Sequence, residues 1–103
     1  MDNFFQRAFS VVKQIPEGRV STYGQIAQMI GEPRKARYVG FAMHQSPGVA
    51  GGVPCHRVVF KDGSLAPGFA FGGPDAQREL LEAEGVQFLE NGKVDMNHYL
   101  WEA

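Results

Sequence analysis

The chain has 103 residues, enough for one small domain and too few for two, so we expect a single domain over residues 1–103. A hydrophobic content of 44% and an aromatic content of 12% can supply a modest core, which excludes a wholly disordered chain. The single cysteine, Cys55, excludes an internal disulfide and every zinc site that needs several cysteines.

No apolar run reaches the length of about 18 residues that a transmembrane helix needs. The first residues, Met-Asp-Asn-Phe-Phe-Gln-Arg, lack the basic start and apolar stretch of a secretory signal. We therefore expect a cytoplasmic protein with a reduced cysteine and no membrane contact.

The overall charge of −1 conceals an uneven distribution along the chain. Residues 1–61 carry a net charge of +5, and residues 62–103 carry −6. A basic half can bind a polyanion despite a near-neutral total, because the local potential steers and holds the ligand. Ordinary solvated surface charge is the alternative interpretation.

The first half of the chain predicts short amphipathic helices. The first helix begins behind Asp2 as its N-cap, ends before Pro16, and buries an apolar face made of Phe4, Phe5, Ala8, Phe9 and Val12. The second is capped by Ser21 or Thr22 and buries Tyr23, Ile26, Ala27 and Ile30.

Gly31 ends the second helix, and Pro33 suits the first turn of a third helix over about residues 34–43. Two short helices around a glycine-containing turn match a helix-turn-helix. The third helix opens with basic side chains placed to meet phosphates and bases: Arg34, Lys35 and Arg37. A purely structural pair of helices is the alternative.

The second half of the chain is richer in loops. A loop of Gly, Ser and Pro over residues 44–52 precedes a short strand at residues 58–60 and a tight turn at 61–64. A glycine-rich loop with two phenylalanines covers residues 66–73.

A fourth helix is expected from Pro74 to Glu84, ended by Gly85 as its C-terminal cap. The tail contains Asn91-Gly92, which predicts a weak hairpin. The last large side chains are expected to cover the core: Tyr99, Leu100 and Trp101.

Cys55 and His56 are neighbours that could carry chemistry. A cysteine attacks as its thiolate, and thiolate formation needs a nearby cation or a paired imidazole. Adjacent residues in a strand point to opposite faces, so pairing needs a sharp turn after Pro54. An inert buried cysteine and a hydrogen-bonded structural histidine are the alternatives.

Residues 54–59 (Pro-Cys-His-Arg-Val-Val) resemble the active-site motif of the O6-alkylguanine-DNA alkyltransferases. The resemblance extends to residues 18–27 (Gly-Arg-Val-Ser-Thr-Tyr-Gly-Gln-Ile-Ala), 36–43 (Ala-Arg-Tyr-Val-Gly-Phe-Ala-Met) and 80–85 (Leu-Leu-Glu-Ala-Glu-Gly). It implies a mostly α, winged-helix-like helix-turn-helix domain with short β-hairpin elements that enters the DNA minor groove. It implies no metal and no other cofactor.

The resemblance also implies residue roles. Arg37 would intrude into the base stack in place of an extruded nucleotide, and Tyr23 would rotate the neighbouring phosphate, with its hydroxyl near guanine N3. In active members the Cys55 thiolate takes the alkyl group irreversibly, with His56 as its water-linked base and Glu84 orienting His56.

Further residues are expected around these. The DNA-binding set would add Thr22, Arg34, Lys35 and, for close approach to the groove, Gly40. The lesion pocket would be formed by Met43, Ser46, Val58, Phe69 and Phe71, although several of these side chains could equally belong to the core.

Three features depart from the alkyltransferase pattern. The N-terminal domain that many alkyltransferases carry is not present in this sequence, and Ser46-Pro47 stands where Asn-Pro is usual. The loop over residues 63–72 is longer, with Phe69-Ala70-Phe71 in place of Tyr-Ser, which should enlarge the pocket. These features resemble the alkyltransferase-like proteins, which bind the lesion without repairing it; that group has Trp or Ala where Cys55 stands.

Two functions from different classes follow. The preferred hypothesis is a monomeric alkyltransferase-like sensor that flips O6-alkylguanine out of duplex DNA and passes the lesion to nucleotide excision repair proteins. The alternative is a methyltransferase that moves the alkyl group to Cys55. A sequence-specific regulator would need base-reading side chains and usually dimerisation, and nothing indicates the oxyanion hole of a cysteine hydrolase.

Overall fold

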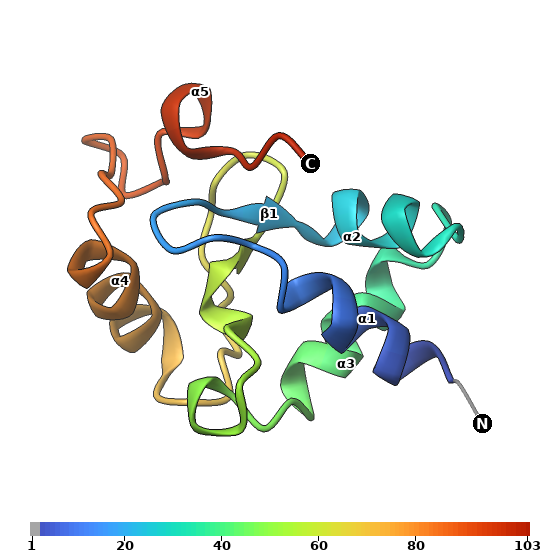
Figure 1. Cartoon of the computed structure of the whole chain (residues 1–103). Coiled ribbons are helices and arrows are strands. Elements are labelled where there is room, and N and C mark those ends of the chain that lie inside the picture. The colour runs from blue at the N-terminus through green and yellow to red at the C-terminus, as the bar shows by residue number, and fades with distance from the viewer. Residues whose placement is uncertain (1–2) are drawn as a thin grey trace.

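The computed structural model describes residues 3–103. Most regular structure is helical, and the elements in chain order are α1 (Phe4–Val12), β1 (Ser21–Thr22), α2 (Tyr23–Ile30), α3 (Ala36–His44), η1 (Val49–Gly51), η2 (Cys55–Arg57), β2 (Val58–Val59), α4 (Gly73–Ala83) and α5 (Met96–Tyr99). Figure 1 shows α1, α2 and α3 gathered at one end of the molecule and α4 at the other, with β1 between them. The predicted mostly helical fold is confirmed.

Helices α1, α2 and α3 pack against one another because each presents a small apolar face at helical spacing. The cap of α1 is Asn3, whose side chain accepts from the backbone N–H of Gln6 at 2.9 Å. The expected cap, Asp2, lies outside the described residues. Thr22 caps α2, and Gly31 ends α2 at φ 89°, a backbone conformation that favours glycine.

The predicted helix-turn-helix is present as α2 and α3, but α3 begins two residues later than expected. The backbone N–H of Lys35 bonds to the carbonyl of Glu32 at 2.9 Å, which forms a turn in front of the helix. Pro33 and Arg34 therefore lie before α3 instead of in its first turn.

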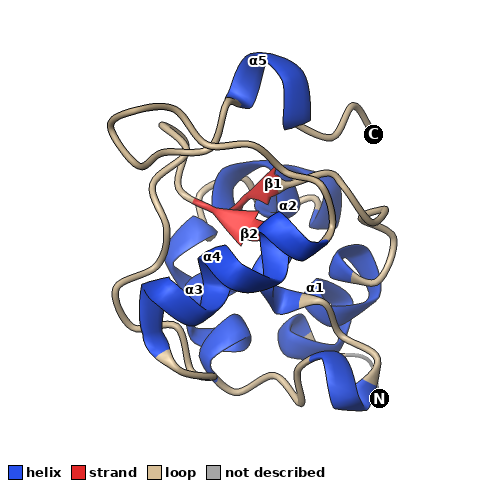
Figure 2. Ribbon diagram, turned by 90° about the vertical axis from the view of Figure 1, so that its left-hand side faces the viewer, coloured by secondary structure: helices blue, strands red, loops and turns tan. Residues whose placement is uncertain are grey.

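A parallel pair of strands joins the two halves of the chain. Ser21 pairs with Val58 and Thr22 with Val59, and Figure 2 shows β1 and β2 side by side. Adjacent strand residues point to opposite faces, so Val58 enters the core under α1–α3 while Val59 enters a second core. That second core is formed by Val20, Val59, Leu81, Val86 and Val94.

The C-terminal part differs in detail from the prediction. The expected hairpin is reduced to one antiparallel bridge between Phe88 and Val94. The chain then forms the unexpected short helix α5 and returns to Val20, whose carbonyl accepts from the backbone N–H of Trp101 at 2.7 Å. None of the helices within residues 3–103 is long and apolar enough to cross a membrane.

Gln77 of α4 holds three separate segments together. Its side chain is fully buried; the amide nitrogen donates to the carbonyls of His56 at 3.1 Å and Val58 at 3.0 Å. Its oxygen accepts from the backbone N–H of Ala66 at 2.9 Å. One amide therefore ties α4 both to the segment around Cys55 and to the loop that follows β2.

We predict that Gln77→Leu lowers the free energy of unfolding by about 2–3 kcal/mol, because it leaves three buried backbone groups without partners. Chemical denaturation followed by circular dichroism measures this change. The matched control is Gln28→Leu on the exposed side of α2, where a change within about 0.5 kcal/mol is expected. Equal effects of the two substitutions would contradict the bracing role of Gln77.

Candidate lesion-binding site

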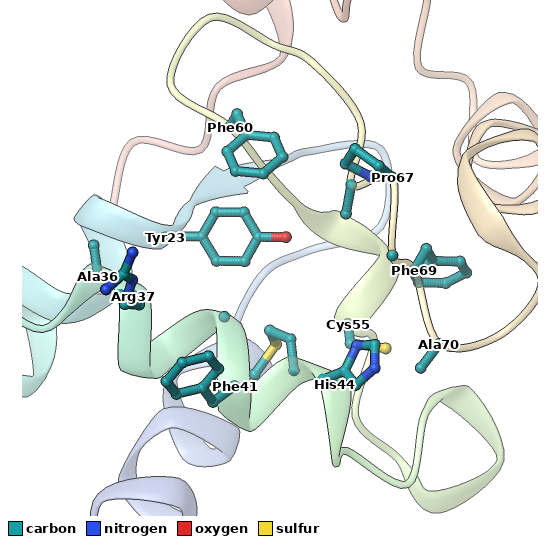
Figure 3. A pocket seen from close by; sticks show the side chains of 14 residues that line it. Tyr23, Ala36, Arg37, Phe41, His44, Cys55, Phe60, Pro67, Phe69 and Ala70 are labelled. Carbon is teal, nitrogen blue, oxygen red and sulfur yellow. The ribbon is translucent and has the colours of Figure 1, made fainter.

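A cavity of about 450 Å³ opens between α3 and the loop that follows β2. Its wall is mainly apolar and is formed by Tyr23, Ala36, Arg37, Gly40, Phe41, Met43, His44, Cys55, Phe60, Ala66, Pro67, Gly68, Phe69 and Ala70. Figure 3 shows Arg37 at one side of the pocket and the group of Cys55, His44 and Phe69 at the other. The size suits a flipped nucleobase or a molecule of similar size.

One face of α3 supplies most of one wall, because positions three and four apart lie on the same side of a helix. Arg37, Gly40, Phe41 and His44 have this spacing. A Cβ added at Gly40 would meet no other atom within 4 Å, so internal packing does not require glycine there. Because Gly40 has no side chain, it leaves open space in the pocket wall beside Arg37.

Tyr23 begins α2, and its hydroxyl points across the pocket toward the side that holds Cys55 in Figure 3. Burial, and then the proximity of Cys55, raise the pKa of Tyr23 to about 12. The phenol therefore stays protonated at neutral pH and can donate a hydrogen bond into the pocket.

Cys55 starts the short helix η2, which provides the sharp turn expected after Pro54. The thiol is buried, and burial raises its pKa, although a hydrogen bond with Ser46 acts in the opposite direction. The Ser46 hydroxyl also accepts from the backbone N–H of Gly48 at 3.0 Å. Ser46 thus braces the loop locally and touches the cysteine.

Behind Cys55, a carboxylate joins two neighbouring side chains. Glu84 accepts from the His56 ring nitrogen Nε2 at 2.9 Å and from two nitrogens of Arg57 at 2.9 and 2.7 Å. Arg57 also donates to the carbonyl of Ile15 at 2.8 Å, which connects this group to the turn that follows α1. The predicted contact between Glu84 and His56 is therefore formed.

The bond to Glu84 decides the form of the neutral imidazole. Because a carboxylate accepts, Nε2 of His56 carries the proton and Nδ1 keeps a free lone pair. Nδ1 is buried and has no hydrogen-bond partner within residues 3–103. Burial lowers the pKa of His56 and outweighs the contribution of Glu84, so the ring is neutral at pH 7 with one nitrogen able to accept a proton.

The predicted DNA-binding residues lie in α2 and α3 or directly before these helices. Arg34 is exposed in the turn before α3, and Arg37 is exposed at the pocket. Lys35 pairs with Glu32 at 2.8 Å, which partly neutralises it. Thr22 uses its hydroxyl to cap α2.

Two of the five residues predicted for the lesion pocket line this cavity. Met43 and Phe69 line the cavity, whereas Val58 is directed into the core by the strand geometry. Ser46 lies beside Cys55 but outside the lining, and Phe71 packs on Phe69 instead.

The sequence analysis missed other lining residues, among them Phe41, His44, Phe60 and Pro67. The i+4 and i+7 spacing of Phe41 and His44 from Arg37 was a signal for the first two. No local signal identified Phe60 or Pro67, since the loop that carries them is placed by tertiary contacts. Within residues 3–103, no group of three or more His, Cys, Asp or Glu side chains is arranged to hold a metal ion.

The comparisons define the class of protein. A family described as the DNA-binding domain of 6-O-methylguanine DNA methyltransferase matches residues 3–86, and the chain belongs to this family.

Two curated relatives match nearly all of the chain. A DNA base-flipping protein of Escherichia coli is 41% identical over 102 residues, which cover 97% of this chain and 75% of the relative. Alkyltransferase-like protein 1 of Schizosaccharomyces pombe is 38% identical over 106 residues, which cover 98% and 96%. The crystal structure of S. pombe Atl1 in complex with damaged DNA containing O6-carboxymethylguanine matches with a TM-score of 0.84, at 36% identity over 100% of this chain and 98% of that one.

We predict that Glu84→Gln lowers the free energy of unfolding at pH 7 by about 2 kcal/mol, because Arg57 and His56 lose a buried anionic partner. Hydrogen bonds from both side chains outweigh burial and hold the pKa of Glu84 below its ordinary value of 4.5. This stabilisation is complete above pH 4.5 and is lost as the pH falls through the lower, folded-state pKa.

The difference between parent and variant should therefore narrow on acidification, as measured by denaturation at pH 7, 5 and 3.5. The control is Glu82→Gln, at an exposed position on the same helix that pairs only with Arg78. A gap between parent and Glu84→Gln that does not depend on pH would contradict the ionic role.

Proposed function

We propose that this protein binds O6-alkylguanine in duplex DNA through the minor groove, holds the extruded base in the pocket beside Cys55, and acts as a lesion sensor. The observation that carries the proposal is the position of Arg37 at the mouth of a base-sized, mainly apolar cavity with Cys55 on its other side. The similarity to a base-flipping protein and to an alkyltransferase-like protein over nearly the whole chain supports it.

Base extrusion costs a few kcal/mol in lost stacking and pairing. The planar guanidinium of Arg37 can enter the vacated space and offset part of this cost by stacking and by donating hydrogen bonds. The open space at Gly40 leaves room for the DNA backbone next to Arg37. Arg34 and Lys35 add phosphate contacts that do not read the sequence, as a search for damage at any position requires.

The ionisation of the buried pair favours sensing over transfer. Alkyl transfer needs a thiolate, formed when the Cys55 proton moves to the free nitrogen of His56. Burial raises the pKa of Cys55 and lowers that of His56, so it disfavours both charged groups of the resulting pair. Both shifts oppose formation of the thiolate in the unbound protein, which supports sensing.

The hydrogen bond between Glu84 and His56, the residue that follows Cys55, is the observation that favours a second candidate, stoichiometric transfer of the alkyl group to Cys55. In that reaction the sulfur–carbon bond forms and the carbon–O6 bond breaks, with its electron pair going to guanine. The thiol proton passes to His56, and the dealkylated nucleobase takes up a proton. The products are guanine and an S-alkyl cysteine.

In the proposed cellular role, one copy of this single domain acts in the cytoplasm. The bound, distorted duplex would then be passed to nucleotide excision repair proteins. The cytoplasmic location and the transfer to repair proteins both depend on the proposed lesion binding.

We predict that Arg37→Ala and Tyr23→Ala each weaken binding to an O6-methylguanine duplex by about tenfold or more, the equivalent of one or two lost contacts in the flipped state. Fluorescence anisotropy with lesion and unmodified duplexes measures this. Cys55→Ala should bind as tightly as the parent, and Arg78→Ala, on α4, is the matched arginine control. Unchanged affinity of Arg37→Ala would contradict base flipping.

The choice between sensing and transfer is made by intact-protein mass after incubation with excess O6-methylguanine duplex. As a sensor, the protein is expected to bind tightly without any change in mass. A gain of one methylene group, abolished by Cys55→Ala, would establish the transferase instead. The same samples give the affinity, so an absence of transfer cannot be confused with an absence of binding.

A further inference from the structure

The chain contains three histidines, and their surroundings differ. The rings of His56 and His98 each form a hydrogen-bonded pair with a carboxylate, that of Glu84 at 2.9 Å and that of Asp95 at 2.7 Å. His44, at the end of α3, forms no such pair within the described part of the chain, and its exposed side chain lines the pocket.

His44 lies where the substituent of a bound base would be. In Figure 3 its ring is on the same side of the pocket as Cys55, Phe69 and Ala70, opposite Arg37. A Cβ added at Gly68 would stand 3.7 Å from the His44 ring, so the loop after β2 passes close to it. When O6 of a flipped guanine faces Cys55, the group attached to O6 extends among these side chains.

The chemistry of this end of the pocket is otherwise apolar. Met43, Phe69, Ala70 and Pro67 offer only van der Waals contacts to an adduct. An imidazole among them adds a hydrogen-bond donor, and a cation once it is protonated. A hydrogen bond from a charged donor to a carboxylate is stronger than one between neutral groups.

We propose that His44 is a specificity-determining residue that selects O6-carboxyalkylguanine over O6-alkylguanine with an uncharged substituent, by pairing its protonated ring with the adduct's carboxylate. This inference rests on the proposed lesion binding and names the substrate class that the pocket prefers. The complex of the similar S. pombe protein with O6-carboxymethylguanine DNA is consistent with a pocket of this family that admits an acidic adduct.

For a pH-dependent preference to come from His44, the other ionisable groups that face it must keep their charge between pH 5.5 and 8. From α2, Tyr23 has a pKa of about 12 and stays neutral; from η2, the raised pKa keeps Cys55 a thiol. Arg37, on α3 itself, stays protonated throughout. The loop from Ala66 to Ala70 contributes no ionisable side chain. A pH-dependent preference for a carboxylate would therefore report on the charge of His44.

The test measures the affinity of the full chain for duplexes with O6-carboxymethylguanine, O6-methylguanine or guanine at pH 5.5 and 8. The expected result is a carboxymethyl-to-methyl preference that is about tenfold greater or more at pH 5.5, the size of a hydrogen bond to a charged group. His44→Gln, which keeps a donor and loses the charge, should remove this pH dependence.

The matched control is His98→Gln, which alters an exposed histidine on α5 and should behave as the parent. A preference that does not vary with pH, or that His44→Gln retains, would overturn the proposal for His44. Equal affinity for both lesions and for guanine would instead overturn the proposed lesion binding. Because His44 is exposed, loss of folding is not expected, and circular dichroism of both variants checks this.

Discussion

The site depends on the carboxylate of Glu84. It lies at the C-cap of α4, and it accepts from His56 and from Nε and Nη2 on one edge of the Arg57 guanidinium. Arg57 in turn donates to the carbonyl of Ile15. The Glu84–Arg57 pair therefore connects α4, η2 and the turn that follows α1. The cysteine lies directly before these residues, and the direction of its side chain follows from how the short helix is held.

The parallel pairing of β1 with β2 complements this connection. It sets Thr22 beside Val59, so the start of α2 and its Tyr23 lie close to the segment that carries Cys55. Gln77 then ties the same segment to α4 and to the loop that closes the pocket. The pocket therefore borders the first core, which supplies Tyr23, Met43 and Cys55 to its wall, and its other wall is the loop that Gln77 ties to α4.

This arrangement separates binding from reactivity. The mouth carries an exposed, permanently charged Arg37, whereas the interior holds a thiol and an imidazole that burial keeps neutral. A flipped base is accommodated mainly by shape, apolar contact and the Tyr23 hydroxyl. In the proposed selectivity, the polar groups at the Cys55 side of the pocket, His44 among them, distinguish between O6 substituents.

Local signals in the sequence determined the helices, their glycine stops and the helix-turn-helix, because capping and apolar spacing act over a few residues. The motif around Cys55, together with Arg37 and Tyr23, also indicated the class of site. Only the tertiary structure decided that Val58 enters the core while Phe60 and Pro67 reach the pocket. These outcomes depend on the pairing of β1 with β2, in which Ser21 lies opposite Val58, 37 residues later in the chain. They also depend on the hydrogen bonds that Gln77 forms to distant segments. Long-range contacts of this kind leave no periodic pattern in the chain.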